Sequence, residues 1–279
     1  MMMLARAKRL IGLRSRPKHA DAAVRAVGSG LPGEVPTVGY RPDDNEHRWK
    51  LIDREFARDA PDAPCILEIG SNFGYFSLKA AQRFGQGRVF SVEGSYGTGN
   101  QGSREVKDQR QIQETDGVRK HLSLRDDLGL GNDIVCVGVV DARTYKRIAE
   151  AGIAFDYQIS LSVFHWVVTA SKSFGIDPRE ILTDHLLAAR TTFIELPDMQ
   201  QRKPMPGIYR DYATIPQAIS EAAAAHGVAL RITYLGSCSW YGTRDTYRVD
   251  LDPAVEPRQR AAELPSERIA EILGVQVAR

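Results

Sequence analysis

Short runs of apolar and β-branched residues alternate with helix-like stretches between residues 45 and 251. This alternation predicts an α/β fold in which helices cover a mostly parallel, doubly wound sheet. Seven strands are expected, at residues 64–69, 88–92, 133–140, 155–163, 191–195, 229–235 and 243–251. Helices are expected at residues 47–59, 75–84, 142–151, 178–189 and 215–226, and in a polar stretch around residues 102–115.

The last two predicted strands differ from the others in their connection. Residues 236–242 join them, and this segment is too short for a crossover helix. We therefore expect an antiparallel hairpin at one end of the sheet. In such a sheet a ligand binds at the carboxyl ends of the strands, near the point where the strand order reverses.

The two ends of the chain are the least globular parts of the sequence. The first 25 residues hold seven basic side chains and one acidic side chain. They predict a basic amphipathic helix that either packs on the domain or contacts an anionic membrane face or a partner. A loop is expected at residues 27–44, and a short helix with Ser266 as its cap near the C-terminus. The expected division is an N-terminal helix and loop (1–44), a central domain (45–251) and a C-terminal extension (252–279).

Composition excludes several classes of protein. Lys and Arg total 37 against 35 Asp and Glu, and this net charge of +2 gives no chain-wide attraction to nucleic acid, which is not an expected partner. The cysteines, Cys65, Cys136 and Cys238, lie far apart in apolar stretches, which indicates buried reduced thiols. No apolar run reaches the roughly 18 residues that span a bilayer. A cytoplasmic protein is expected, with membrane association through the N-terminal helix as the alternative, and the oligomeric state stays open.

The most informative segment is the turn after the first predicted strand. Glu68 ends this strand, and the chain turns through Gly70 and Gly74 into a helix. The three-glycine spacing of a dinucleotide-phosphate loop is absent, and so is the Lys of a Walker loop. The two glycines allow a bulky, unphosphorylated ligand to approach the backbone, and Glu68 can pair with a cation. This pattern suits a sulfonium-bearing nucleoside, and an ordinary turn without a ligand is the alternative.

A second acid follows about twenty residues later. Glu93 ends the second predicted strand, where its carboxylate can accept both hydroxyl protons of a ribose. Over residues 65–251 this pattern resembles the class I S-adenosylmethionine-dependent methyltransferases. The resemblance implies a Rossmann-like sheet of order 3-2-1-4-5-7-6 with strand 7 antiparallel, and S-adenosyl-L-methionine as cofactor.

The resemblance also implies a set of cofactor-binding residues. Glu93 would bind the ribose, and Asp141 the adenine amino group, although Asp141 could equally cap the helix that begins at residue 142. Ser160 on the fourth strand is expected near the cofactor. The residues expected on the methionine side are Glu68, Gly70, Ser71, Asn72, Phe73 and Gly74.

Candidate catalytic residues follow the fourth and fifth strands. His165 is a candidate general base for a hydroxyl, because an unperturbed pKa near 6.5 lets it accept a proton at neutral pH. Trp166 could stack on a sugar or aromatic acceptor. The alternative is that His165 starts the next helix and makes a structural hydrogen bond, while Trp166 belongs to the core. Glu195 could orient His165 or bind the acceptor, or it could be a solvated carboxylate at a strand end.

A Pro-rich basic segment at residues 200–210 is expected on the acceptor side. Its charges would favour an anionic acceptor, and a solvated loop is the alternative. No metal is expected, since the only plausible ligands are His165, His185 and Glu195. The candidate substrate-binding residues of the segment are Arg202, Lys203, Tyr209 and Arg210.

The expected activity is O-methylation of a hydroxyl on a glycan or small-molecule acceptor. The Asn/Asp-Pro-Pro-Tyr/Phe motif of amino-group methyltransferases is absent after the fourth strand, which disfavours attack by a base nitrogen. Segments 161–166 and 193–197 are also similar to enzymes that methylate the terminal phosphate of RNA. Two alternatives therefore remain, an enzyme of that kind and a module that binds S-adenosylmethionine without chemistry.

Overall fold

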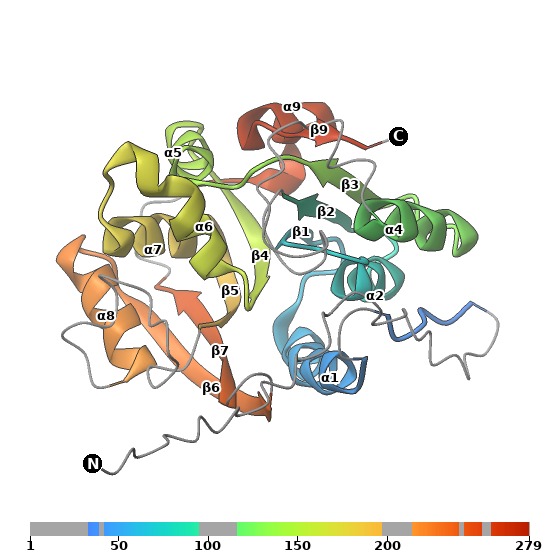
Figure 1. Ribbon diagram of the computed structural model, residues 1–279, viewed down its shortest axis with the longest axis horizontal. Coiled ribbons are helices and arrows are strands. Elements are labelled where there is room, and N and C mark those ends of the chain that lie inside the picture. The colour runs from blue at the N-terminus through green and yellow to red at the C-terminus, as the bar shows by residue number, and fades with distance from the viewer. Residues whose placement is uncertain are drawn as a thin grey trace, which may run out of the picture.

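A computed structural model of the protein describes residues 33–38, 42–94, 116–196, 214–239, 243–252 and 258–278 (Figure 1). The strands are β1 Cys65–Ile69, β2 Arg88–Glu93, β3 Asp133–Val137, β4 Ile153–Leu161, β5 Ala189–Glu195, β6 Leu230–Ser239, β7 Thr243–Leu251, β8 Gln259–Arg260 and β9 Gln276–Val277. The helices are α1 Pro42–Asp59, α2 Tyr75–Arg83, α4 Asp116–Asp127, α5 Ala142–Glu150, α6 Phe164–Ser171, α7 Pro178–Leu187, α8 Ile215–Ala225 and α9 Ser266–Leu273, with 3-10 turns η2 Lys172–Phe174 and η3 Ala261–Glu263.

The strands form one sheet in the order β6-β7-β5-β4-β1-β2-β3-β9 (Figure 1). Strands β1 to β5 pair in parallel, whereas β7 runs antiparallel to both β5 and β6. The predicted order 3-2-1-4-5-7-6, with an antiparallel seventh strand, is therefore confirmed. The strand order reverses between β1 and β4, and this geometry places a ligand cleft at the carboxyl ends of these two strands.

Alternate residues of the central strands face opposite sides of the sheet. Leu67 in β1 and Ile194 in β5 belong to an apolar cluster that includes residues of α5 to α9. Their neighbours Ile66 and Phe193 belong to a second cluster that includes residues of α1 and α2. Because helices cover both faces, every residue of β1 is buried, as is typical of parallel sheets.

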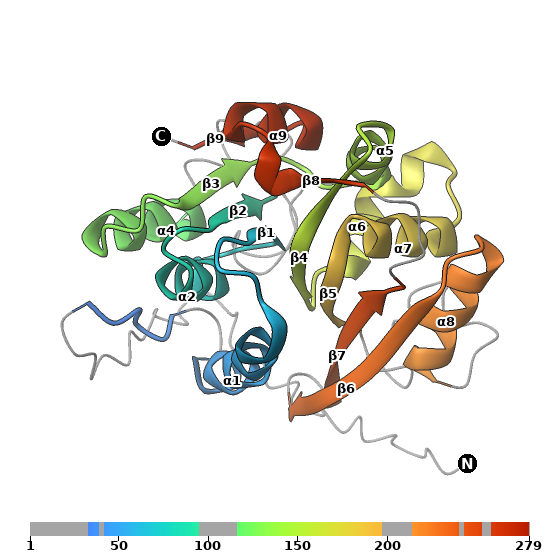
Figure 2. The same cartoon turned by 180° about the vertical axis from the view of Figure 1, so that it is seen from behind.

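The C-terminal residues add strands to this sheet. β8 pairs in parallel with the start of β4, and β9 pairs antiparallel with β3. Figure 2 shows this red segment passing from β8, near β4, to α9 and β9, beside β3. Ile269 and Leu273 of α9 are buried in the core, so the described C-terminal residues pack as part of the same body.

Two buried arginines fasten α1 to the far part of the sheet. Arg48 Nε lies 2.8 Å from Glu195 Oε1 at the end of β5. Arg248 of β7 donates hydrogen bonds to Glu55 and Asp59 of α1, at 2.9 and 2.5 Å. The helix that precedes β1 is thus tied to strands β5 and β7, which lie beyond β4 in the sheet.

Two helices differ from the prediction. α4, whose pattern is mostly polar, was not predicted. α6 begins at Phe164, one residue before His165, and agrees with the alternative in which His165 starts a helix. α1 begins at Pro42, within the segment expected to be a loop. Ser266 is not a cap: Pro265 occupies the cap position, and Ser266 Oγ accepts a hydrogen bond from Arg88 Nη1 at 3.1 Å. The basic N-terminal helix and the polar stretch 102–115 lie outside the described residues.

Two strands also differ from the prediction. β3 ends at Val137 rather than at residue 140, which frees residues 138–140 to line a cleft. β6 continues to Ser239 through an irregularity between Tyr234 and Gly236, where only a connection was expected. All three cysteines are buried and free, and their burial was predicted from the apolar stretches around them. Within the described ranges, no helix has the length and apolar character needed to cross a membrane.

Candidate functional site

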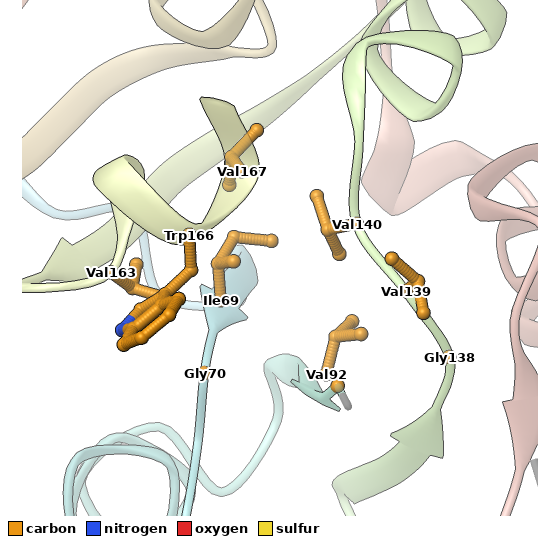
Figure 3. Close-up of a pocket in the computed structure, with 10 residues that line it drawn as sticks. Ile69, Gly70, Val92, Gly138, Val139, Val140, Val163, Trp166 and Val167 are labelled. Carbon is orange, nitrogen blue, oxygen red and sulfur yellow. The ribbon is translucent and has the colours of Figure 1, made fainter. Parts of the chain in front are cut away.

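A small cleft, open to solvent, lies at the point where the strand order reverses. Figure 3 shows Val163 and Trp166, from the α6 side, across the cleft from Val139 and Val140, which follow β3. The side chains that line it are apolar apart from the indole N–H of Trp166, and glycine backbone supplies polar groups. Such a lining suits a planar ring held by a few polar groups. The residues that line it are Ile69, Gly70, Val92, Gly94, Gly138, Val139, Val140, Val163, Trp166 and Val167.

The glycine loop is anchored on β2. The amides of Gly70 and Ser71 donate to the carbonyl of Val92 at 2.8 and 3.2 Å. Gly70 has a φ of 74°, and a β-carbon there would lie 2.7 Å from Val163 Cγ2. A glycine is required at this position because the start of α6 packs directly on the loop backbone.

Two polar atoms of this loop are buried without a partner. Ser71 Oγ and Asn72 Oδ1 have no hydrogen-bond partner among the described residues. Burying a polar group without a hydrogen bond costs about 1–3 kcal/mol, so these atoms favour a ligand or water that pairs with them. Phe73 lies elsewhere: its ring packs at the margin of the apolar cluster of α1 and α2.

Glu93 lies beside the glycine loop, as its position after β2 predicts. It is only 4% exposed, and its Oε2 accepts the backbone N–H of Asn72 at 2.5 Å. Burial raises the pKa of Glu93 to about 7, and the Asn72 hydrogen bond opposes this shift in part. Glu93 therefore changes charge near neutral pH.

Glu68 differs from the expectation of a carboxylate that meets a cation. Its side chain is buried and accepts a hydrogen bond from Ser77 Oγ of α2. Burial, reinforced by the charges of Asp133 and Glu93, raises the pKa of Glu68 well above its usual range. This corrects the expectation, because the environment of Glu68 favours a neutral carboxyl that links β1 to α2.

Gly74 also has a different role from the one expected. It has a φ of 81°, and a β-carbon there would overlap the ring of His121 in α4, at 2.1 Å from Cδ2. His121 is fully buried, and its Nε2 lies 2.7 Å from Asp133 Oδ2. Gly74 therefore makes room for a buried histidine rather than for a ligand.

Asp141 caps α5, the alternative that the sequence left open. Its Oδ1 accepts the amides of Arg143 and Thr144 at 2.9 and 3.3 Å, and its Oδ2 lies 2.6 Å from Arg143 Nη2. Both oxygens thus have partners within the helix start. Ser160 is fully buried in β4, and its Oγ has no partner in the part of the chain that the structure describes. A contact of Asp141 or Ser160 with a cofactor stays a prediction.

His165 is the second residue of α6. Its Nδ1 is buried and without a partner among the described residues. Burial, together with the charge of Arg244, lowers the pKa of His165 to about 4. The expected pKa near 6.5 is therefore wrong, and the imidazole is neutral throughout the physiological range. The ring of Trp166, whose centroid lies 4.9 Å from that of His165, borders the cleft.

Glu195 is not solvated, and its oxygens form hydrogen bonds with residues other than His165. It is fully buried, and Oε1 accepts from Arg48 Nε and Thr246 Oγ1 at 2.8 and 2.9 Å. Oε2 accepts from Ser162 Oγ at 2.8 Å. The solvated carboxylate and the contact with His165 are therefore corrected, because a buried ion pair with α1 occupies Oε1. Binding of the acceptor by Glu195 stays a prediction.

Three residues near the site, Ser162, Arg48 and Arg244, were not predicted from the sequence. Ser162 has a φ of 56°, a conformation that nothing about a serine in sequence indicates. Arg48 lies in an amphipathic helix and Arg244 in an edge hairpin, where arginines are ordinarily exposed, yet they are only 5% and 6% exposed. The predicted acceptor residues Arg202, Lys203, Tyr209 and Arg210 lie outside the described residues. Among the described residues, no group of three or more potential ligands could hold a metal ion.

No protein-family model matches the sequence, and no curated protein matches it either. Among solved structures, EvdMO1 is 17% identical with a TM-score of 0.46, over 76% of this chain and 42% of that one. The bifunctional kinase-methyltransferase WbdD is 17% identical with a TM-score of 0.45, over 74% of this chain and 38% of that one. Precorrin-6y C5,15-methyltransferase from Geobacter metallireducens is 9% identical with a TM-score of 0.42, over 76% of this chain and 90% of that one. The chain thus spans about two fifths of EvdMO1 and of WbdD.

The contact between Gly74 and His121 gives a stability prediction. Gly74→Ala combines a left-handed φ with overlap on a buried ring, and we expect it to lower the free energy of unfolding by about 2–4 kcal/mol. Gly129→Ala is the matched control, because Gly129 has a φ of 65° with nothing within 4 Å of a β-carbon. Only the backbone cost of about 1–2 kcal/mol is expected there. Urea unfolding measures both, and equal losses would contradict the packing role of Gly74.

Proposed function

We propose that the protein is an S-adenosylmethionine-dependent methyltransferase. The observation that carries this proposal is the position of Glu93, which lies at the end of β2 and accepts a hydrogen bond from the glycine loop at the strand-order reversal. A carboxylate in that position can accept both hydroxyl protons of a ribose. The strand order implied by the family resemblance supports the same function.

The described residues fit the parts of this cofactor. The valine walls and the Trp166 ring suit an adenosine, and residues 138–140 offer backbone beside it. The unpartnered Ser71 Oγ and Asn72 Oδ1 lie on the glycine loop, where they could pair with the amino-acid end. The two-glycine loop offers no pyrophosphate cradle, so a dinucleotide fits less well.

Bound S-adenosylmethionine would supply a methyl group on a sulfonium, whose leaving group is the neutral thioether S-adenosylhomocysteine. Such a methyl group needs chiefly a nucleophile aligned with the sulfur–carbon bond. The chain then has three tasks: to bind the nucleoside, to exclude water from the cleft, and to hold the acceptor in line. For a hydroxyl acceptor a fourth task is proton removal, which we assign to His165.

We further propose that the acceptor is a hydroxyl on a glycan or small molecule that carries an anionic group. The pKa of His165 is held low in part by the charge of Arg244. A carboxylate or phosphate on the acceptor would offset that charge and raise the pKa of His165, making it a stronger base when the acceptor is bound. Arg202, Lys203 and Arg210 are predicted to add to the same attraction.

Calorimetric titration with S-adenosylhomocysteine and with NADH tests the cofactor. We expect micromolar binding of S-adenosylhomocysteine, no binding of NADH, and loss of binding in Glu93→Ala. With a pKa of Glu93 near 7, the ionised fraction rises between pH 6 and pH 8, and the affinity should rise up to about tenfold. Glu93→Gln is the matched control, since it should abolish this increase. An affinity that changes neither in the Glu93 variants nor with pH would contradict the role of Glu93 in binding the ribose.

His165→Asn tests the base. With uronic acids, phosphorylated sugars and neutral sugars offered as acceptors, we expect methyl transfer to an anionic acceptor in the wild type. The variant should lose about 10²–10⁴-fold in turnover while its affinity for S-adenosylhomocysteine changes little. Equal losses in turnover and in affinity for S-adenosylhomocysteine would show that His165 has a structural role. Tight cofactor binding without transfer to any acceptor would favour a binding module over an enzyme.

A further inference from the structure

The turn between β4 and α6 contains a residue in an unfavourable conformation. Ser162 has a φ of 56°, and Asn72 is the only other non-glycine residue with a positive φ among the described residues. L-residues other than Asn and Asp rarely adopt this region, because the β-carbon approaches the following carbonyl oxygen. Such a conformation persists when surrounding contacts hold it.

The contact that holds Ser162 comes from β5. Its hydroxyl donates to Glu195 Oε2 at 2.8 Å, and it follows Leu161, which pairs with Glu195 in the sheet. The acceptor is itself fixed, since Arg48 of α1 and Thr246 of β7 both donate to Glu195 Oε1. The Ser162 hydroxyl therefore binds a carboxylate of β5 that donors from two other elements, α1 and β7, hold in place.

The residues that follow this turn form one wall of the cleft. Val163 comes next in the chain and packs on Gly70 so closely that no β-carbon fits between them. Trp166 N donates to the Val163 carbonyl at 2.8 Å, which fixes the first turn of α6. Val163, Trp166 and Val167 all line the cleft (Figure 3).

We propose that Ser162 is a positioning residue for this cleft: its hydrogen bond to Glu195 holds the left-handed turn that sets Val163 against Gly70 and Trp166 at the cleft wall. Hydrogen bonds connect Arg48 to Glu195 and Glu195 to Ser162, and Val163 follows Ser162 in the chain. The inference rests on the proposed function only for the identity of the ligand.

Two substitutions separate this role from a direct contact with ligand. Ser162→Ala removes the hydroxyl and leaves a β-carbon in the left-handed region, so the turn should relax to another conformation. Ser162→Gly also removes the hydroxyl, but glycine adopts the left-handed region freely. If the turn is what matters, Ser162→Gly should behave like the wild type and Ser162→Ala should not. Thr183→Val is the matched control, since it loses the buried hydrogen bonds of Thr183 to Arg179 and Ala222, far from the turn in sequence.

The first readout is fluorine NMR of protein labelled with 5-fluorotryptophan. The chain has three tryptophans, and loss of one resonance in Trp166→Phe assigns Trp166. We expect one resonance at the same shift in the wild type, Ser162→Gly and Thr183→Val, and a shifted or split resonance in Ser162→Ala. The second readout is affinity for S-adenosylhomocysteine, which should weaken about tenfold in Ser162→Ala and stay within about threefold in Ser162→Gly.

Two results would overturn the proposal. An unchanged Trp166 resonance in Ser162→Ala would show that the turn holds without the hydrogen bond. A loss of affinity in Ser162→Gly equal to that in Ser162→Ala, with the Trp166 resonance of Ser162→Gly at the wild-type shift, would show that the hydroxyl acts on the ligand and not through the turn. If Ser162→Ala does not fold, Ser162→Gly alone decides between these outcomes. A wild type that does not bind S-adenosylhomocysteine would refute the proposed function, while the Trp166 resonance would still test the positioning role.

Discussion

The cleft depends on one close contact, between the side chain of Val163 and the backbone of Gly70. These residues lie on the two sides of the strand-order reversal, one after β4 and the other after β1. Parallel strands whose connections leave in opposite directions open a gap at that point. The contact joins the start of α6 to the glycine loop, and both residues line the cleft that also has residues 138–140 in its wall.

Three glutamates at strand ends illustrate how burial assigns different roles to the same side chain. Glu68 is buried against α2, where its environment favours the neutral form. Glu195 is also buried, but an arginine and two hydroxyls surround it, so it serves as a fixed acceptor. Glu93 lies beside the glycine loop, and its pKa of about 7 leaves it able to ionise when a ligand supplies hydrogen-bond donors. Only Glu93 combines a position at the loop with a charge that a ligand can alter.

Much of the fold could be predicted from the sequence, because the strands are short apolar runs and the hairpin connection is too short for a crossover. The position of Glu93 followed from the same reasoning, since a residue at the end of a parallel strand lies at the ligand edge. The role of Gly74 could not be predicted, because it depends on a contact with His121. His121 lies in α4, a helix whose mostly polar sequence did not indicate a buried face. The burial of Glu195 could not be predicted either, because its partner Arg48 lies 147 residues earlier in the chain. Backbone strain at Ser162 has no signature in sequence at all.

We propose that the cleft between α6 and the segment after β3 holds the nucleoside of S-adenosylmethionine, with Glu93 on its ribose. A crystal structure of the complex with S-adenosylhomocysteine tests this most directly. We expect both ribose hydroxyls within hydrogen-bond distance of the Glu93 carboxylate, the adenine between Val140 and the α6 wall, and the amino-acid end at Ser71 and Asn72. A nucleoside bound away from Glu93, or bound with its ribose pointing out of the cleft, would contradict it.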